Sequence, residues 1–315
     1  MRTDRADRAG SVQATGVNGE LAGAAEKASG NRGADRIQQG CETSRAGAAG
    51  WHVFLILYTI LILFPIAFAV SNSFKTSSDA YNTILELIPR RPTLDGYRQV
   101  FAKLPFFRIA LNTFLIAASV TVCKTLTSLL AAYSFVFFQY RGKKVLYFLM
   151  LITMFVPFTV TMIPNYLLIT QMGLRDNIWG VALPQMADVL GIFLLRQAMR
   201  GIPKSLVEAA KLDNIPDLKI MKDIIIPLVR PAVISTGIIF FINSWNEYVW
   251  PVLILKSVEH YTLPLALQMY ISAEGGTDFP LAMAVSVLTM LIPLVLYLIF
   301  QKYIISTFAM TGVKG

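Results

Sequence analysis

Six apolar runs divide this 315-residue chain, and each is long enough to cross a membrane. A helix needs about 20 predominantly apolar residues to span the roughly 30 Å of hydrocarbon in a bilayer. A spanning helix also satisfies its own backbone hydrogen bonds, which lipid cannot do. The sequence therefore predicts an all-α polytopic membrane protein. Its six transmembrane helices are expected over residues 51–74, 108–138, 145–169, 178–195, 231–255 and 280–303.

Composition agrees with a membrane protein and excludes several other classes. Only 15% of residues are charged, against about 25% in ordinary soluble domains. The net charge of +9 is spread between the apolar runs, so it does not indicate a nucleic-acid partner. Cys41 and Cys123 are too far apart to suggest a disulfide framework or a metal site. Neither GxxxxGK[ST] nor HExxH occurs, so we expect no nucleotide site, metal or cofactor within this chain.

The distribution of basic residues predicts the orientation of the chain. Residues 1–50 are rich in Gly, Ala, Ser, Arg and Asp, which predicts a disordered tail ahead of a transmembrane domain at 51–315. Six spans place both termini on one side, and 19 of the 28 Lys and Arg residues lie on that side. Cytoplasmic loops carry such an excess. We therefore expect a multi-pass protein of the cell inner membrane with cytoplasmic N- and C-termini.

A polar segment, residues 196–230, separates the fourth and fifth spans and would also be cytoplasmic. Ser205-x-x-Glu208 has the pattern of a helix-capping box. Asn214 suits the left-handed backbone with which many helices end, and Pro227 would end a second short helix. The sequence thus predicts two short helices joined by a tight turn. The simpler alternative is a helical loop in which Glu208 serves only its own cap.

Several motifs resemble ABC importer permeases of the carbohydrate-uptake type, which are type I and depend on a binding protein. Glu208-Ala-Ala-x-x-Asp213-Asn214 is similar to their EAA loop, which usually has Gly at the position of Asn214. The resemblance covers about 75–315. It also rests on Pro92-Thr-Leu-Asp-Gly-Tyr97, Gly191-Ile-Phe-Leu-Leu-Arg-Gln197, Ile202-Pro203, Trp245-Asn-Glu-Tyr248, Trp250-Pro251, Tyr261-Thr-Leu-Pro264 and Thr311-Gly-Val-Lys-Gly315.

This resemblance implies a subunit that works with several partners: a second permease subunit, two ATPase subunits that bind the ATP, and an extracytoplasmic solute-binding protein. The EAA loop of the family forms a coupling helix that docks on the ATPase. The residues implied for coupling here are Glu208, Ala209, Ala210, Asp213, Asn214 and Pro227. The C-terminal residues 312–315 resemble tails that reach toward the ATPase, or they are a frayed end.

Polar residues lie deep in the predicted fifth span. A carboxylate within a membrane is costly and normally faces a bundle interior or a cavity. One interpretation is a translocation pathway or gate, and the other is hydrogen bonding between helices in the bundle core. The residues concerned are Asn243, Trp245, Asn246, Glu247 and Tyr248. Lys124, in the second span, would snorkel to the interface, pair with Glu247 or face the partner subunit.

The sequence thus favours a permease subunit that imports a sugar or a related solute, such as an oligosaccharide, polyol or glycerol phosphate. The alternative is a stand-alone ion-coupled transporter or channel. That alternative predicts more charged residues within the spans and internally repeated halves, and it leaves the polar segment without a role.

Overall fold

The computed structural model describes residues 50–82, 86–271 and 278–312, and all regular secondary structure in these ranges is helical. This confirms the predicted all-α class. Apart from Gly50, the predicted N-terminal tail lies outside the described residues, as do residues 313–315 of the C-terminal motif. The chain divides into two compact units, residues 1–66 and 67–315.

The first long helix, Gly50–Ser73, agrees with the predicted first span to within one residue. Large apolar side chains are exposed all around its N-terminal part, among them Trp51 at 67% and Leu61 at 69%. An all-round apolar surface of this length is suited to lipid rather than to water.

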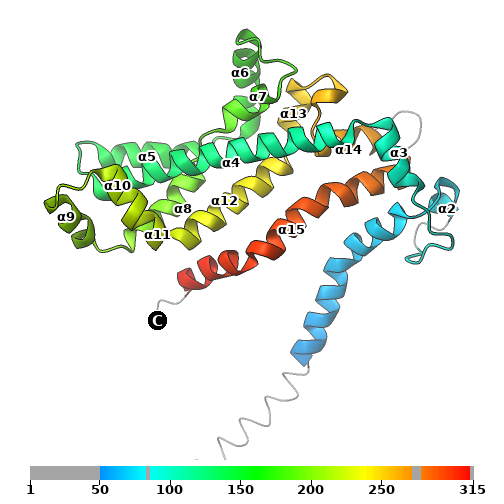
Figure 1. Ribbon diagram of the computed structural model, residues 1–315, viewed down its shortest axis with the longest axis horizontal. Coiled ribbons are helices and arrows are strands. Elements are labelled where there is room, and N and C mark those ends of the chain that lie inside the picture. The colour runs from blue at the N-terminus through cyan, green and yellow to red at the C-terminus, as the bar shows by residue number, and fades with distance from the viewer. Residues whose placement is uncertain (1–49, 83–85, 272–277, 313–315) are drawn as a thin grey trace, which may run out of the picture. The chain divides into compact units, whose positions relative to one another are not determined.

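The remaining helices belong to the second unit (Figure 1). In chain order they are α2 Ser77–Asn82, α3 Asp95–Lys103, α4 Phe106–Phe137, α5 Lys143–Thr153, α6 Phe158–Gln171, α7 Ile178–Ala182, the 3-10 turn η1 Leu183–Gln185, α8 Val189–Arg200, α9 Lys204–Leu212, α10 Asp217–Ile220, the π-helical turn η2 Met221–Ile225, α11 Ile226–Leu228, α12 Arg230–Trp245, α13 Val249–Ile254, the 3-10 turn η3 Val258–His260, α14 Leu263–Ile271 and α15 Phe279–Gly312.

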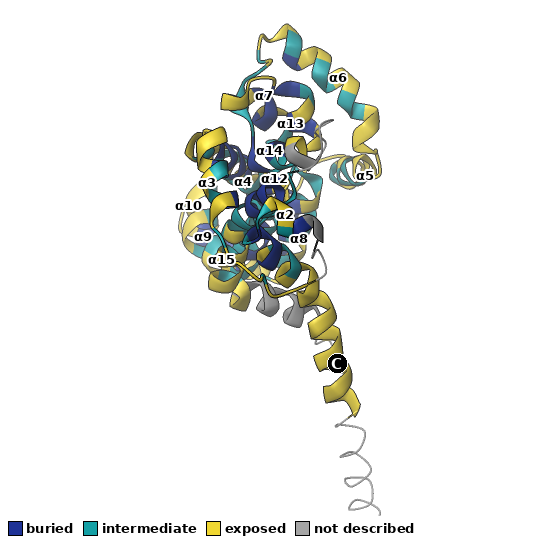
Figure 2. Cartoon of the chain, turned by 90° about the vertical axis from the view of Figure 1, so that its right-hand side faces the viewer, coloured by how far each residue is buried: buried dark blue, intermediate teal, exposed yellow. Residues whose placement is uncertain are grey.

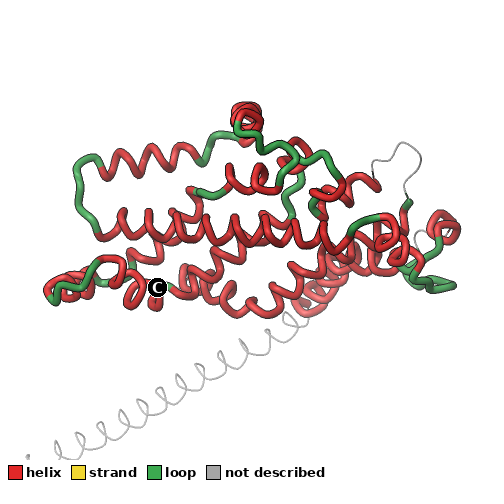
Figure 3. Tube along the Cα trace, turned by 45° about the horizontal axis from the view of Figure 1, so that its top comes forward, coloured by secondary structure: helices red, strands yellow, loops and turns green. Residues whose placement is uncertain are grey.

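Three helices in the described ranges are unbroken, long and apolar enough to cross a membrane: Gly50–Ser73, α4 and the Phe279–Lys302 part of α15. Up to six spans result if each sharply bent helix pair is one span. The α5–α6 pair bends by 93° and the pair Ile178–Gln185 and Val189–Arg200 by 45°. Figure 3 shows α5 and α6 almost perpendicular. The predicted third and fourth spans are therefore broken rather than continuous.

The breaks have local causes. Pro157 is the N-cap of α6, where its missing N–H removes a donor that a continuous helix would need. Pro184 lies in the 3-10 turn η1 that interrupts the fourth run. The predicted fifth span, 231–255, is also interrupted, because α12 ends at Trp245 and α13 begins at Val249. At its other end, α12 meets the segment Asp217–Leu228 at 86°.

Helix α4 is the centre of the second unit, and it packs along α8 and α12 (Figure 1). Gly191 in α8 permits the close approach, since a Cβ there would lie 2.3 Å from Cζ of Phe240 and 2.5 Å from Oγ of Ser128. Figure 2 shows buried residues gathered where these helices meet, whereas α6 is mostly exposed. The exposed apolar surface of α5 and α6 is again suited to lipid.

Three buried clusters divide the core along α4. At one end, residues of α4 and α8 pack with α9, α10 and η2. At the other end, α4 packs with α3, α12, α14 and α15. A third cluster joins α4 to α6, α7 and α13. The polar segment 196–230 therefore lies at the opposite end of α4 from α3 and α14, as the alternation of spans requires.

Candidate functional site

Helix α9 ends in the left-handed turn that the sequence predicts at Asn214, where φ is 56°. The Ile215 N–H donates to the Ala210 carbonyl at 3.1 Å, and the Asn214 N–H donates to the Lys211 carbonyl at 3.0 Å. These two bonds form a Schellman motif, which satisfies the last carbonyls of a helix. The turn reverses the chain, so that α10 begins at Asp217.

The predicted capping box at Ser205 and Glu208 does not form. Helix α9 begins two residues earlier than the pattern requires, with Pro203 rather than Ser205 as its N-cap. The Leu206 N–H donates to the Pro203 carbonyl at 3.2 Å, and no side chain caps this helix. Glu208 is therefore not engaged in its own cap and remains exposed.

The inner face of α9 is fixed to the transmembrane core. Val207 and Ala210 are 4% and 5% exposed, and they pack with Ile220, Leu195 and Leu129. This burial anchors the segment by apolar contact with both α4 and α8.

Asp217 adds a polar anchor to the same segment. Its Oδ1 accepts a hydrogen bond from the Tyr133 hydroxyl of α4 at 2.9 Å. The same oxygen lies 3.1 Å from Nζ of Lys211, which ties the start of α10 to the end of α9. The two short helices are thus attached to the end of α4 that we predict to be cytoplasmic.

The outer face of α9 and its turn carries most of the predicted coupling residues. Five of them are exposed: Glu208, Ala209, Asp213, Asn214 and Pro227. The sixth, Ala210, is buried in the chain's own core, which differs from the partner contact that the motif implies.

Two exposed leucines belong to the same surface and were not predicted as site residues. Leu212 is 84% exposed at the end of α9, and Leu218 is 68% exposed in α10. Both flank the turn at Asn214. Large apolar side chains that are mostly exposed and gathered on a polar segment are typical of a docking surface. The sequence signal was the pair of leucines that interrupts an otherwise charged stretch.

A second candidate site is a cavity of about 270 Å³ within the predicted membrane region. It combines two aromatic rings, several amide and hydroxyl groups, and two charged side chains. The lining residues are Lys124, Phe158, Thr161, Asn165, Pro184, Gln185, Ala187, Glu247 and Trp250. In the described part of the chain, no group of three or more His, Cys, Asp or Glu side chains could hold a metal.

Lys124 of α4 pairs with Asp188, not with Glu247. Its Nζ lies 3.1 Å from Oδ2 of Asp188, and the two side chains are 13% and 26% exposed. Oδ1 of Asp188 also accepts from the Leu190 N–H at 2.8 Å and so caps α8. The pair therefore joins α4 to the break in the fourth run, with neither charge left unpaired.

Glu247 lies in the break between α12 and α13 and lines the cavity. Its Oε1 accepts from the backbone N–H groups of Val249 at 2.9 Å and Trp250 at 3.3 Å. The carboxylate thus satisfies donors at the start of α13 that the break would otherwise leave free.

The other predicted pathway residues occupy different environments. Trp245 has no exposed surface, and its indole N–H donates to the Thr289 carbonyl at 3.0 Å. It is a core residue, which differs from the predicted pathway position. Asn243, Asn246 and Tyr248 are exposed on this subunit. Polar side chains exposed within a membrane span are expected to face a partner or water rather than lipid.

At the opposite end from the polar segment, Asp176 holds two loops together. It accepts from the backbone N–H groups of Lys256 at 2.8 Å and Ser257 at 2.9 Å, and from the Ser257 hydroxyl. Nδ1 of His260 lies 3.2 Å from the same carboxylate. Burial alone would raise the pKa of Asp176, but these hydrogen bonds outweigh it and hold the pKa well below its ordinary value.

Comparison with known proteins agrees with this arrangement. The chain is 31% identical over 266 residues to the arabinooligosaccharides transport system permease protein AraQ of Bacillus subtilis, covering 84% of this chain and 94% of that protein. It is 28% identical over 262 residues to the sn-glycerol-3-phosphate transport system permease protein UgpE of Brucella melitensis, covering 81% and 93%.

A solved structure has the same fold. It is a bacterial ABC transporter involved in the import of the acidic polysaccharide alginate, with a TM-score of 0.74 and 24% identity over 83% of this chain and 97% of that chain. Residues 124–308 match the family described as binding-protein-dependent transport system inner membrane component. These matches favour a transport subunit over a stand-alone transporter or channel. The chain therefore belongs to this family of inner membrane components, and it is a permease subunit of an ABC importer.

Proposed function

We propose that this chain forms half of the translocation pathway for a sugar or related solute and is driven by a separate ATPase, which docks within residues 205–227 on the exposed face of α9 and its turn. An oligosaccharide, a polyol or glycerol phosphate are the solutes we consider. Relatives named for arabinooligosaccharides and for sn-glycerol-3-phosphate support this range.

The observation that carries the proposal is the two-sided character of α9. Val207 and Ala210 fix one side in the transmembrane core, while Glu208 and Ala209 are exposed on the other. A helix that is rigidly attached on one side can transmit a displacement imposed on the other side.

The exposed side chains have complementary roles in this docking. Glu208 supplies a charged contact, Ala209 allows the partner to approach closely, and Leu212 supplies apolar area. Asp213 and Asn214 form the turn at the edge of the surface. The partner subunits bind and hydrolyse ATP, and this chain contributes no cofactor.

The cavity at Glu247 is our candidate for this subunit's share of the pathway. The rings of Phe158 and Trp250 offer apolar area, and Asn165 and Gln185 offer amide groups suited to hydroxyl-bearing solutes. Asn243 and Asn246 would face the second permease subunit across the pathway, because exposed amides are costly in lipid.

The assembly we propose contains this chain, a second and different permease subunit, two ATPase subunits and an extracytoplasmic solute-binding protein. One solved relative is described as an alginate ABC transporter in complex with a periplasmic protein carrying an alginate pentasaccharide, which supports the last partner. Both termini and the polar segment would face the cytoplasm.

Charge reversal at Glu208 tests the docking role. Glu208→Lys should lower uptake, and the ATPase activity stimulated by the loaded binding protein, by about tenfold or more, because an interface charge is replaced by its opposite. Membrane insertion and expression should be unchanged, since the side chain is exposed.

Asp223→Lys is a matched control. Asp223 is also exposed in the polar segment and makes no ion pair with any described residue, but it lies in η2, outside α9 and its turn. The same charge change there should leave uptake close to wild type. Wild-type uptake and ATPase stimulation in the Glu208→Lys transporter would refute the docking role.

A further inference from the structure

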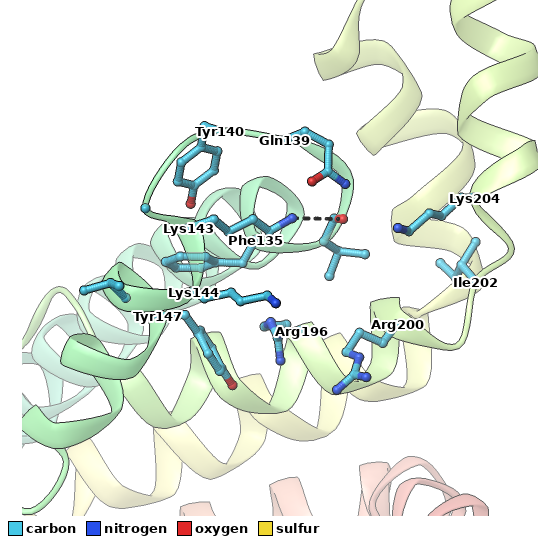
Figure 4. Close-up of a pocket in the computed structure, with 13 residues that line it drawn as sticks. Phe135, Gln139, Tyr140, Lys143, Lys144, Tyr147, Arg196, Arg200, Ile202 and Lys204 are labelled. Carbon is cyan, nitrogen blue, oxygen red and sulfur yellow. Dashed lines mark hydrogen bonds between the residues drawn. The ribbon is translucent and has the colours of Figure 1, made fainter.

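A large cavity lies beside the polar segment and is separate from the pathway cavity. Its volume is about 860 Å³. The end of α4, the turn that follows it, the start of α5, the C-terminal half of α8 and the start of α9 line it (Figure 4). A volume in this range is typical of sites for molecules of several hundred daltons rather than for a bare ion.

The charge of this cavity has one sign. Five cations line it, namely Lys143, Lys144, Arg196, Arg200 and Lys204, and no Asp or Glu does. Among the described residues, none of the five forms a salt bridge. Clustering like charges is costly, and an anion bound among them relieves that cost.

The five cations do not have equal roles. Lys143 donates to the Phe138 carbonyl at 2.6 Å and to the Val136 carbonyl at 3.4 Å, so it serves the C-terminal end of α4. The other four extend from α5, α8 and α9 around the cavity (Figure 4).

Arg196 and Tyr147 show that part of the cavity wall is pre-arranged. The guanidinium carbon of Arg196 lies 3.9 Å from the centre of the Tyr147 ring, which fixes the plane of its donor groups. The buried Nε of Arg196 and the buried hydroxyl of Tyr147 have no hydrogen-bond partner within the described chain. An oriented Arg with free donors is suited to a phosphate group.

The surface next to the cavity indicates whether such a phosphate group would belong to a lipid or to a soluble anion. Helix α5 continues from Lys144 with exposed apolar side chains, including Val145 at 61%, Phe148 at 62% and Leu149 at 54%. A soluble anion would not contact these apolar side chains of α5, whereas the acyl chains of a lipid would cover them. Basic pockets between helices at the cytoplasmic face are suited to anionic lipid headgroups.

We infer that this cavity binds the headgroup of an anionic phospholipid of the cytoplasmic leaflet, with its acyl chains along α5. The assignment to the cytoplasmic leaflet depends on the membrane orientation given in the proposed function. Through Arg200 and Lys204, the headgroup would join the start of α9 to α5 and hold the docking helix at the membrane surface.

Native mass spectrometry of the full-length chain in mild detergent tests the site, with phosphatidylglycerol and phosphatidylcholine as probes. The wild type should retain phosphatidylglycerol in preference to phosphatidylcholine. Lys144→Gln with Arg200→Gln removes two exposed cations. Because each cation contributes about one kcal/mol near an anionic lipid, the double variant should retain phosphatidylglycerol about thirtyfold less strongly. As a control, Lys219→Gln with Lys222→Gln removes two exposed cations of the polar segment that do not line the cavity, and should change retention little.

Arg196→Lys keeps the charge but loses the planar fork, and should weaken retention by a smaller factor than the double variant. Equal retention of both lipids, or equal retention by the cavity variant and its control, would overturn the site. Displacement of phosphatidylglycerol by millimolar inorganic phosphate would show that the cavity is a site for a soluble anion instead. If the double variant lost ATPase coupling but retained phosphatidylglycerol, the cavity would instead be a contact site for a protein partner.

The lipid site and the proposed function can fail separately. Solute uptake by a wild type that retains no phosphatidylglycerol would refute only the lipid site. Selective lipid retention by a protein that supports no uptake would refute only the transport proposal.

Discussion

Asn214 sets the direction in which the chain leaves α9. Its φ of 56° is in the left-handed region, which costs most residues about 1–2 kcal/mol and costs Gly almost nothing. Because the side chain is exposed, the backbone conformation is the main constraint at this position. The Schellman bonds to Ala210 and Lys211 depend on that conformation.

Substitution at Asn214 should therefore follow backbone tolerance rather than polarity. Asn214→Gly should keep thermal stability and coupling, whereas Asn214→Val should lower stability by about 1–2 kcal/mol and reduce ATPase stimulation. Ser205→Val is the control, since this exposed residue has helical backbone within α9. The interpretation fails if Val at 214 is tolerated as well as Gly, as judged by thermal unfolding in detergent.

Some residues of the site could be predicted from the sequence and others could not. The turn at Asn214 was predictable because few residues tolerate that backbone. The failure of the capping box was not predictable, because the helix begins two residues earlier, with Pro203 in place of Ser205 as its N-cap. The partner of Lys124 was not, because Asp188 lies 64 residues away and only packing of α4 on α8 brings them together.

At the level of helices, the apolar runs predict where the chain crosses lipid but not where each helix breaks. The break after Trp245 contains no proline, and it is stabilised by Glu247, whose carboxylate caps α13. The sequence also could not decide the environment of Trp245, because a tryptophan is equally suited to a buried core and to a binding surface. Its burial against α15 is a tertiary property.

Asp176 connects the loop after α6 to the loop after α13, and its stabilising effect depends on pH. Its pKa in the folded protein lies below the ordinary value of about 3.9. The ionised form therefore stabilises the fold at any pH above that value, and the effect disappears as pH falls below it. Asp176→Asn should cost about 1–3 kcal/mol at pH 7.

Thermal unfolding in detergent between pH 7 and pH 3 measures this effect. The gap between wild type and Asp176→Asn should be constant down to about pH 5 and should narrow below pH 4. Asp223→Asn, at an exposed residue without an ion pair in the described chain, is the matched control. A gap that does not change with pH would show that the carboxylate charge is not responsible.

The whole molecule places its polar segment and its Asp176 loop at opposite ends of α4, and we propose that the membrane lies between them. Replacing both native cysteines and introducing either Asp213→Cys or Lys256→Cys tests this orientation, because both positions are exposed. A membrane-impermeant maleimide should label position 256 in right-side-out vesicles and position 213 in inverted vesicles. Labelling of both positions from one side would contradict the topology.

The 86° bend at Val229 has a mechanical consequence. Only one residue separates α11 from α12, so the two helices form a crank rather than a flexible joint. The 16 residues of α12 are a lever arm of about 24 Å. A tilt of about 10° imposed by a partner on the short arm would move the far end, next to Glu247, by about 4 Å. That displacement exceeds the diameter of a water molecule, so a tilt of this size would be enough to change the width of the proposed pathway next to Glu247.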